Sequence, residues 1–149
     1  MPQATAVSPE TLSETAKATI QAYNDKDWNR ARSLLTPDFV YDEVATGLKV
    51  EGPDEAIPAW KGWAQAFPDS KGTIHSALVS GSSVVLELTW KGTHKGPLQS
   101  PNGAIEPTGK PIELRGCMIL ELAGEKVRLE RHYFDMATLF EQLGLRPLT

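Results

Sequence analysis

The 149-residue sequence has a single cysteine, Cys117, and no hydrophobic run long enough to cross a bilayer. One cysteine cannot form an internal disulfide, and it excludes a zinc site built from several cysteines. Basic residues form no cluster and the formal net charge is −4, so the electrostatic footprint of a nucleic-acid-binding protein is missing. We therefore expect no nucleic-acid partner and no association with a membrane.

The N-terminus lacks the features of a secretory signal, because it has neither a basic segment nor an apolar one. Together with the lone cysteine, this predicts a cytoplasmic protein. We expect residues 1–8 to form a flexible tail and residues 9–149 to form one domain, since this length supplies a sufficient core.

Several motifs of catalysis and cofactor binding are also missing. The chain contains no G-x-G-x-x-G, no P-loop and no G-x-S-x-G elbow. Its three histidines (His75, His94 and His132) are far apart, and none has the H-E-x-x-H spacing of a zinc site. We expect neither an organic cofactor nor a metal.

Apolar periodicity predicts helices in the first half of the chain and strands in the second. Leu12, Ala16 and Ile20 share one helix face, and the preceding Ser8-Pro9 is a typical start. Further helices are predicted over 28–35, 53–67 and 136–143, and strands over 39–44, 73–80, 84–94, 112–122 and 127–135. The glycine- and proline-rich segment 95–111 is a long excursion between strands. This order favours an α+β fold with an antiparallel sheet curled around a helical layer.

Two segments of the chain carry a family resemblance. Residues 90–96 (WKGTHKG) with 107–110 (PTGK), and 124–127 (GEKV) with 133–135 (YFD) and 139–144 (LFEQLG), are similar to the corresponding runs of SnoaL-like polyketide cyclases. This family lies within the nuclear-transport-factor-2-like superfamily. The resemblance spans roughly residues 10–145, nearly the whole chain.

The resemblance implies a conical α+β barrel, with a curved antiparallel sheet wrapped around three N-terminal helices and a short C-terminal helix. Between them lies a pocket for a small hydrophobic molecule. Cyclases of this family close a ring by an intramolecular aldol reaction without a cofactor, and their essential aspartate occupies the position of Asp135. Members usually form homodimers through the convex face of the sheet, so we expect a homodimer.

Strand alternation also bears on Asp135. One face of the last predicted strand begins with apolar residues and is expected to line the pocket: Val127, Leu129, Arg131, Tyr133 and Asp135. Burial would raise the pKa of an aspartate there and suit it to act as a general base. Alternatively, Asp135 is the N-cap of the final helix. Residue type alone leaves both roles open.

His94 falls on the apolar side of its predicted strand. It is either an auxiliary proton donor beside Asp135 or a rim histidine that binds the 95–111 loop. His132 lies on the charged side of the last strand, and His75 cannot be assigned to a face. For both, a surface or dimer-interface role is expected.

The expected substrate-binding walls are mostly aromatic. Trp60 and Trp63 share a face of the third predicted helix, while Tyr41 and Tyr133 offer phenolic hydroxyls to a carbonyl oxygen. Met118 lies on an apolar strand face. Each of these residues is equally suited to ordinary core packing.

These observations favour a cofactor-independent acid/base enzyme acting on a hydrophobic carbonyl compound, by aldol-type cyclisation or isomerisation. An alternative is a non-catalytic domain that binds a hydrophobic ligand or dimerises. A third possibility is an epoxide-hydrolase-like hydrolase, which requires a water held by at least two inward carboxylates or amides.

Overall fold

The computed structural model describes residues 7–100 and 102–145, so most of the predicted tail lies outside the described residues. The described part forms helices α1 (Pro9–Asn24), α2 (Trp28–Ser33), α3 (Pro53–Ala66) and α4 (Met136–Gln142). Its strands are β1 (Leu35–Glu43), β2 (Leu48–Glu51), β3 (Lys71–Ser80), β4 (Ser83–Thr93), β5 (Leu98–Ser100), β6 (Gly103–Ile105), β7 (Pro111–Ala123) and β8 (Lys126–Phe134). None of these helices is long and apolar enough to span a membrane.

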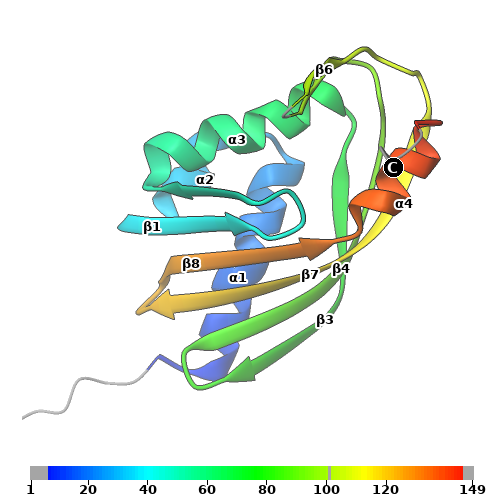
Figure 1. Cartoon of the computed structure of the whole chain (residues 1–149). Coiled ribbons are helices and arrows are strands. Elements are labelled where there is room, and N and C mark those ends of the chain that lie inside the picture. The colour runs from blue at the N-terminus through cyan, green and yellow to red at the C-terminus, as the bar shows by residue number, and fades with distance from the viewer. Residues whose placement is uncertain (1–6, 101, 146–149) are drawn as a thin grey trace, which may run out of the picture.

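Six strands form one curved sheet in the order β2-β1-β8-β7-β4-β3, and the α+β class is confirmed (Figure 1). The curved sheet is open, with β2 and β3 at its edges. One detail of the prediction is wrong. The sheet is mixed and not antiparallel throughout, because β1 runs parallel to β8 while the other neighbours pair antiparallel.

Helix α1 packs against one face of the sheet. Ser8 caps the helix, since its hydroxyl oxygen accepts a hydrogen bond from the Thr11 amide. The predicted stripe of Leu12, Ala16 and Ile20 is buried in the main core with residues of β1, β4 and β7. The helical periodicity of the sequence therefore identified the face that meets the sheet.

The excursion between β4 and β7 carries a small hairpin, β5–β6, which the sequence did not predict. Leu98 of this hairpin is buried in a second core cluster with Phe67 at the end of α3 and Leu139 of α4. The hairpin and α4 therefore close the end of the structure towards which β8 runs (Figure 1).

Candidate functional site

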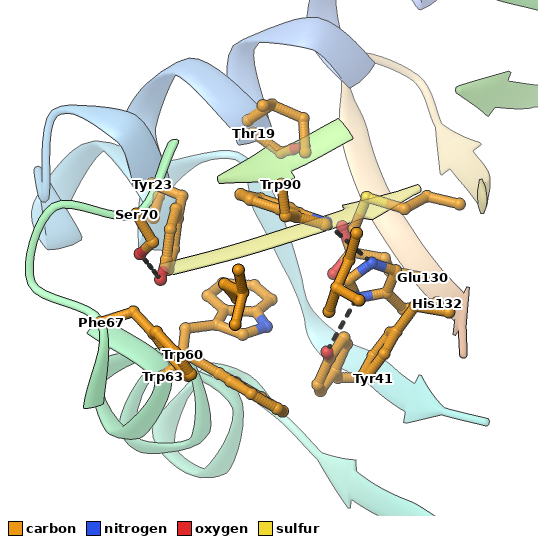
Figure 2. Close-up of a pocket in the computed structure, with 16 residues that line it drawn as sticks. Thr19, Tyr23, Tyr41, Trp60, Trp63, Phe67, Ser70, Trp90, Glu130 and His132 are labelled. Carbon is orange, nitrogen blue, oxygen red and sulfur yellow. Dashed lines mark hydrogen bonds between the residues drawn. The ribbon is translucent and has the colours of Figure 1, made fainter. Parts of the chain in front are cut away.

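A cavity of about 90 Å³, which we call the inner cavity, lies between α1, α3 and the sheet. Its lining is rich in aromatic side chains, among them Tyr23, Tyr41, Trp60, Trp63, Phe67 and Trp90 (Figure 2), and it also includes Phe134. Glu130 and His132 supply the carboxyl and imidazole groups of the lining, which includes no lysine or arginine of the described chain. The inner cavity is therefore an apolar hollow with very few polar groups.

A β-bulge in β8 decides which side chains of this strand reach the inner cavity. Leu122 pairs with Val127, and the next pair joins Glu121 to Leu129, so Arg128 is an extra residue on β8. Because side chains alternate between the two faces of a strand, one extra residue reverses the alternation beyond it.

As a result, Glu130 and His132 face the inner cavity, whereas Tyr133 is 40% exposed on the outer face of the sheet. The prediction that Tyr133 and Asp135 line the pocket is wrong for this reason. The prediction of a surface or interface position for His132 is wrong as well. Strict alternation counted from the start of the strand does not hold beyond the bulge.

Asp135 is exposed and caps α4. Its Oδ1 accepts hydrogen bonds from the amides of Ala137 (2.9 Å) and Thr138 (3.4 Å), and its Oδ2 accepts one from the Thr138 hydroxyl (2.8 Å). The hydrogen bond from the Thr138 hydroxyl is the main cause that lowers the pKa of this carboxyl. The geometry thus favours the helix cap, and the expected buried general base is not found at this position.

Glu130 has the environment that was expected for Asp135. Its side chain is only 3% exposed, and burial, with a smaller effect from the charge of Glu43, raises its pKa to about 8. No hydrogen bond from another described residue contributes to that shift. The carboxyl is consequently free to interact with a bound molecule, and near neutral pH it exchanges readily between its acid and base forms.

His132 is the centre of a buried hydrogen-bonded chain (Figure 2). The indole N–H of Trp90 donates to His132 Nε2 at 3.1 Å, so this nitrogen is the acceptor and the proton of the neutral ring is on Nδ1. His132 Nδ1 then donates to Tyr41 Oη at 3.3 Å, and the Tyr41 hydroxyl donates to Glu43 Oε2 at 2.5 Å. One consistent direction of donation thus runs from Trp90 to Glu43.

Glu43, at the end of this chain, accepts two further hydrogen bonds. The indole N–H of Trp63 donates to Glu43 Oε2 at 2.9 Å, and the Thr46 hydroxyl donates to Oε1 at 2.6 Å. The carboxyl group of Glu43 therefore accepts three hydrogen bonds. Burial lowers the pKa of His132 to about 3, so its ring is neutral at ordinary pH. Burial and then the charge of Glu43 raise the pKa of Tyr41 well above its usual value.

His94 does not line the inner cavity. It is fully buried, its Nδ1 accepts a hydrogen bond from the Thr108 amide at 3.1 Å, and its ring packs on Phe67 at 5.2 Å. Burial lowers its pKa. The geometry therefore favours the alternative weighed above, a histidine that anchors the 95–111 loop. The exposed His75 forms a hydrogen bond with Thr89 through Nε2 and does not line the inner cavity.

Of the other predicted wall residues, Tyr41, Trp60, Trp63 and Met118 do line the inner cavity. Sequence reasoning missed Glu43, Trp90 and Glu130. Glu43 could have been found, because it shares strand parity with Tyr41. Glu130 could not have been found, because the residue types around Arg128 do not indicate a β-bulge.

No group of three or more His, Cys, Asp or Glu side chains in 7–100 and 102–145 is placed to hold a metal ion. The residues at the inner cavity are suited instead to proton transfer, because Glu130 carries an exchangeable proton and the chain through His132 fixes the neighbouring polar groups.

Comparison with known proteins supports the same architecture. A candidate SnoaL-like polyketide cyclase from Jannaschia sp. CCS1 superimposes with a TM-score of 0.83 at 21% identity, covering 97% of this chain and 100% of that one. IdmH of Streptomyces antibioticus, a candidate polyketide cyclase, gives 0.77 at 22%, covering 90% and 99%. An epoxide hydrolase of the LEH-like type from M. tuberculosis gives 0.70 at 19%, covering 90% of each chain.

At these identities the structural likeness shows the fold alone. No curated protein matches the chain in sequence. The family model described as SnoaL-like polyketide cyclase, however, matches residues 13–143. The chain therefore belongs to the SnoaL-like polyketide cyclase family.

Proposed function

We propose that the inner cavity catalyses proton transfer on an uncharged, apolar carbonyl compound, leading to aldol-type ring closure or isomerisation. The observation that carries this proposal is the free, buried carboxyl of Glu130 with a pKa of about 8. Membership of the polyketide cyclase family supports the reaction class. The lack of lysine and arginine in the described lining supports an uncharged substrate.

In the reaction, ionised Glu130 removes a proton from the carbon next to a carbonyl group. The enolate attacks a second carbonyl of the same molecule and forms the new carbon–carbon bond. The Glu130 carboxylic acid then returns the proton to the alkoxide, so the enzyme ends as it began. The hydrogen-bonded chain through His132, Tyr41 and Glu43 fixes these side chains in one arrangement, and the Glu130 carboxyl is not part of it.

The test uses α-hydrogen exchange of acetophenone in D2O, followed by proton NMR, because it detects enolate formation without knowledge of the natural substrate. We expect Glu130→Gln to lower the exchange rate by roughly 10²- to 10⁴-fold, the usual contribution of a general base. The wild-type rate should rise with pH and level off above about 8, since the ionised form is the base.

Asp135→Asn is the matched control. It removes the other carboxyl at the end of β8 and keeps a good capping side chain, so exchange should stay within about twofold of wild type. A large loss in Asp135→Asn with none in Glu130→Gln would restore Asp135 as the base. Binding of acetophenone without any exchange in the wild type would favour the non-catalytic alternative.

The epoxide-hydrolase alternative gains less support. The Asp-Arg-Asp arrangement of limonene-epoxide-hydrolase-type sites needs an arginine, and none of the described residues that line the inner cavity is one. The likeness to the LEH-like enzyme is at 19% identity and concerns the fold.

We also propose that two copies pair through the outer face of the sheet, as the family resemblance leads us to expect. Leu78, Val85 and Ile119 lie side by side across β3, β4 and β7 on this face, and Leu78 is 63% exposed. Light scattering should give twice the chain mass of 16.3 kDa, and Leu78→Asp should shift it towards the monomer. A monomeric wild type at micromolar concentration would contradict this.

A further inference from the structure

A second cavity, of about 1020 Å³, borders the first, and we call it the outer cavity. It lies among the turn between β1 and β2, one side of α3, the β5–β6 hairpin and α4. Its larger apolar side chains are Leu48, Leu98, Ile105, Met136, Phe140 and Leu145. Trp63 lines both cavities, so its side chain is part of the wall between them.

The two cavities differ in what they can hold. An apolar cavity of about 150 Å³ accommodates benzene, and pockets for drug-sized ligands measure about 300–1,000 Å³. The inner cavity, at about 90 Å³, is therefore too small for more than a fragment of a hydrophobic substrate. The outer cavity has room for the remainder.

The Trp63 indole is held by one hydrogen bond and two aromatic contacts, and a rotation of the side chain would break them. Its N–H donates to Glu43 Oε2 at 2.9 Å, and its ring stacks on Phe67 at 6.1 Å and meets the edge of Phe134 at 5.8 Å. Glu43 also borders the outer cavity and accepts the hydrogen bond of Tyr41, which lines the inner one. Moving this one indole would thus join the two cavities beside the polar chain.

Gly62, next to Trp63, lines the outer cavity from the interior of α3. Glycine is unfavourable inside a helix, because it loses more conformational freedom than alanine. No atom lies within 4 Å of a Cβ added at Gly62, and its φ is outside the positive range. Neither the backbone nor a neighbour requires glycine here, so its effect is to leave open space in the cavity wall.

We propose that the substrate is an elongated, uncharged apolar molecule whose reacting end enters the inner cavity while its distal part lies in the outer cavity. Trp63 is the movable wall between the two, and Gly62 keeps the distal space open. The outer cavity, like the inner one, is lined by no lysine or arginine of the described residues, which disfavours a phosphate- or carboxylate-bearing tail. This inference rests on the proposed function.

The experiment compares binding of butanone, a ketone smaller than benzene, with that of its long-chain homologue 2-decanone, measured by NMR titration. The added chain should bury apolar surface in the outer cavity and tighten binding by at least roughly tenfold in the wild type. Gly62→Phe should remove this gain and leave the affinity for butanone within about twofold, because the new ring occupies the outer cavity alone. Gly62→Leu tests the same point with a smaller side chain.

Lys61→Phe is the control, since it places the same ring one residue away on α3, at an exposed position that borders neither cavity. It should leave both affinities unchanged. Trp63→Ala should speed the association of 2-decanone more than that of butanone, because the wall no longer has to move.

Equal affinity of the two ketones for the wild type would overturn the inference, and so would an equal loss of both in Gly62→Phe. Neither result depends on whether Glu130 catalyses hydrogen exchange, so this inference and the proposed function can fail separately.

Discussion

The carboxyl groups of Glu130, in β8, and Asp135, directly after β8, show how strongly position decides chemistry. Glu130 faces the inner cavity, accepts no hydrogen bond that offsets its burial, and has a pKa raised to about 8. Asp135, at the exposed end of the strand, accepts three hydrogen bonds from α4 residues and has a lowered pKa. The acid proposed to react and the acid that caps a helix are thus only five positions apart in the sequence.

The difference has a physical origin in the balance of desolvation and hydrogen bonding. Removing a carboxylate from water disfavours its ionised form, and donated hydrogen bonds favour it. Glu130 experiences the first effect without the second, whereas Asp135 remains in water and gains the second. A raised pKa also makes the folded state less stable as the group ionises, so the reactive position has a cost in stability.

The largest effect that we predict for this comparison is the pH dependence of the free energy of unfolding. Folding raises the pKa of Glu130 from 4.5 to about 8, so its contribution is fully present below 4.5 and is lost as the pH rises towards 8. Folding lowers the pKa of His132 from 6.5 to about 3, so its contribution is present above 6.5 and is lost as the pH falls towards 3. The two effects oppose each other between 4.5 and 6.5, where we expect maximal stability.

We call the loss of stability towards low pH the acid arm and the loss towards high pH the alkaline arm. At about 1.4 kcal/mol for each unit of pKa shift, each arm changes the free energy of unfolding by a few kcal/mol as an order of magnitude. Urea unfolding across this pH range measures both arms. Glu130→Gln should flatten the alkaline arm and leave the acid arm, whereas Asp135→Asn should leave the alkaline arm intact. An alkaline arm of unchanged size in Glu130→Gln would show that Glu130 does not titrate abnormally.

The fold was predictable from the sequence to a greater extent than the site. The spacing of Leu12, Ala16 and Ile20 and the Ser8-Pro9 start predicted α1 and its buried face, since local periodicity and capping determine both. The cavity walls Trp60 and Trp63 were predictable for the same reason, because they share a face of one helix.

The polar residues of the inner cavity depended on long-range strand pairing. Counting alternate residues from Val127 assigned Glu130 and His132 to the wrong face, because the bulge at Arg128 arises from pairing with β7. The parallel pairing of β1 with β8, which brings Tyr41 and Glu43 next to this strand, also joins segments far apart in the sequence. Neither feature leaves a local pattern.

The smallest predicted effect concerns Asp135, the carboxyl group that caps α4. Asp135→Ala removes the side-chain oxygens that accept from Ala137 and Thr138, and loss of an N-cap costs about 1 kcal/mol. The loss should appear in full, because α4 buries Leu139 in the core and cannot unfold without exposing it. Urea unfolding at pH 7 should show it, with Asp135→Asn within a few tenths of a kcal/mol of wild type. The α-hydrogen exchange rate should be unchanged in Asp135→Ala, and a parallel fall in stability and exchange rate would show that the cap and the inner cavity are coupled through α4.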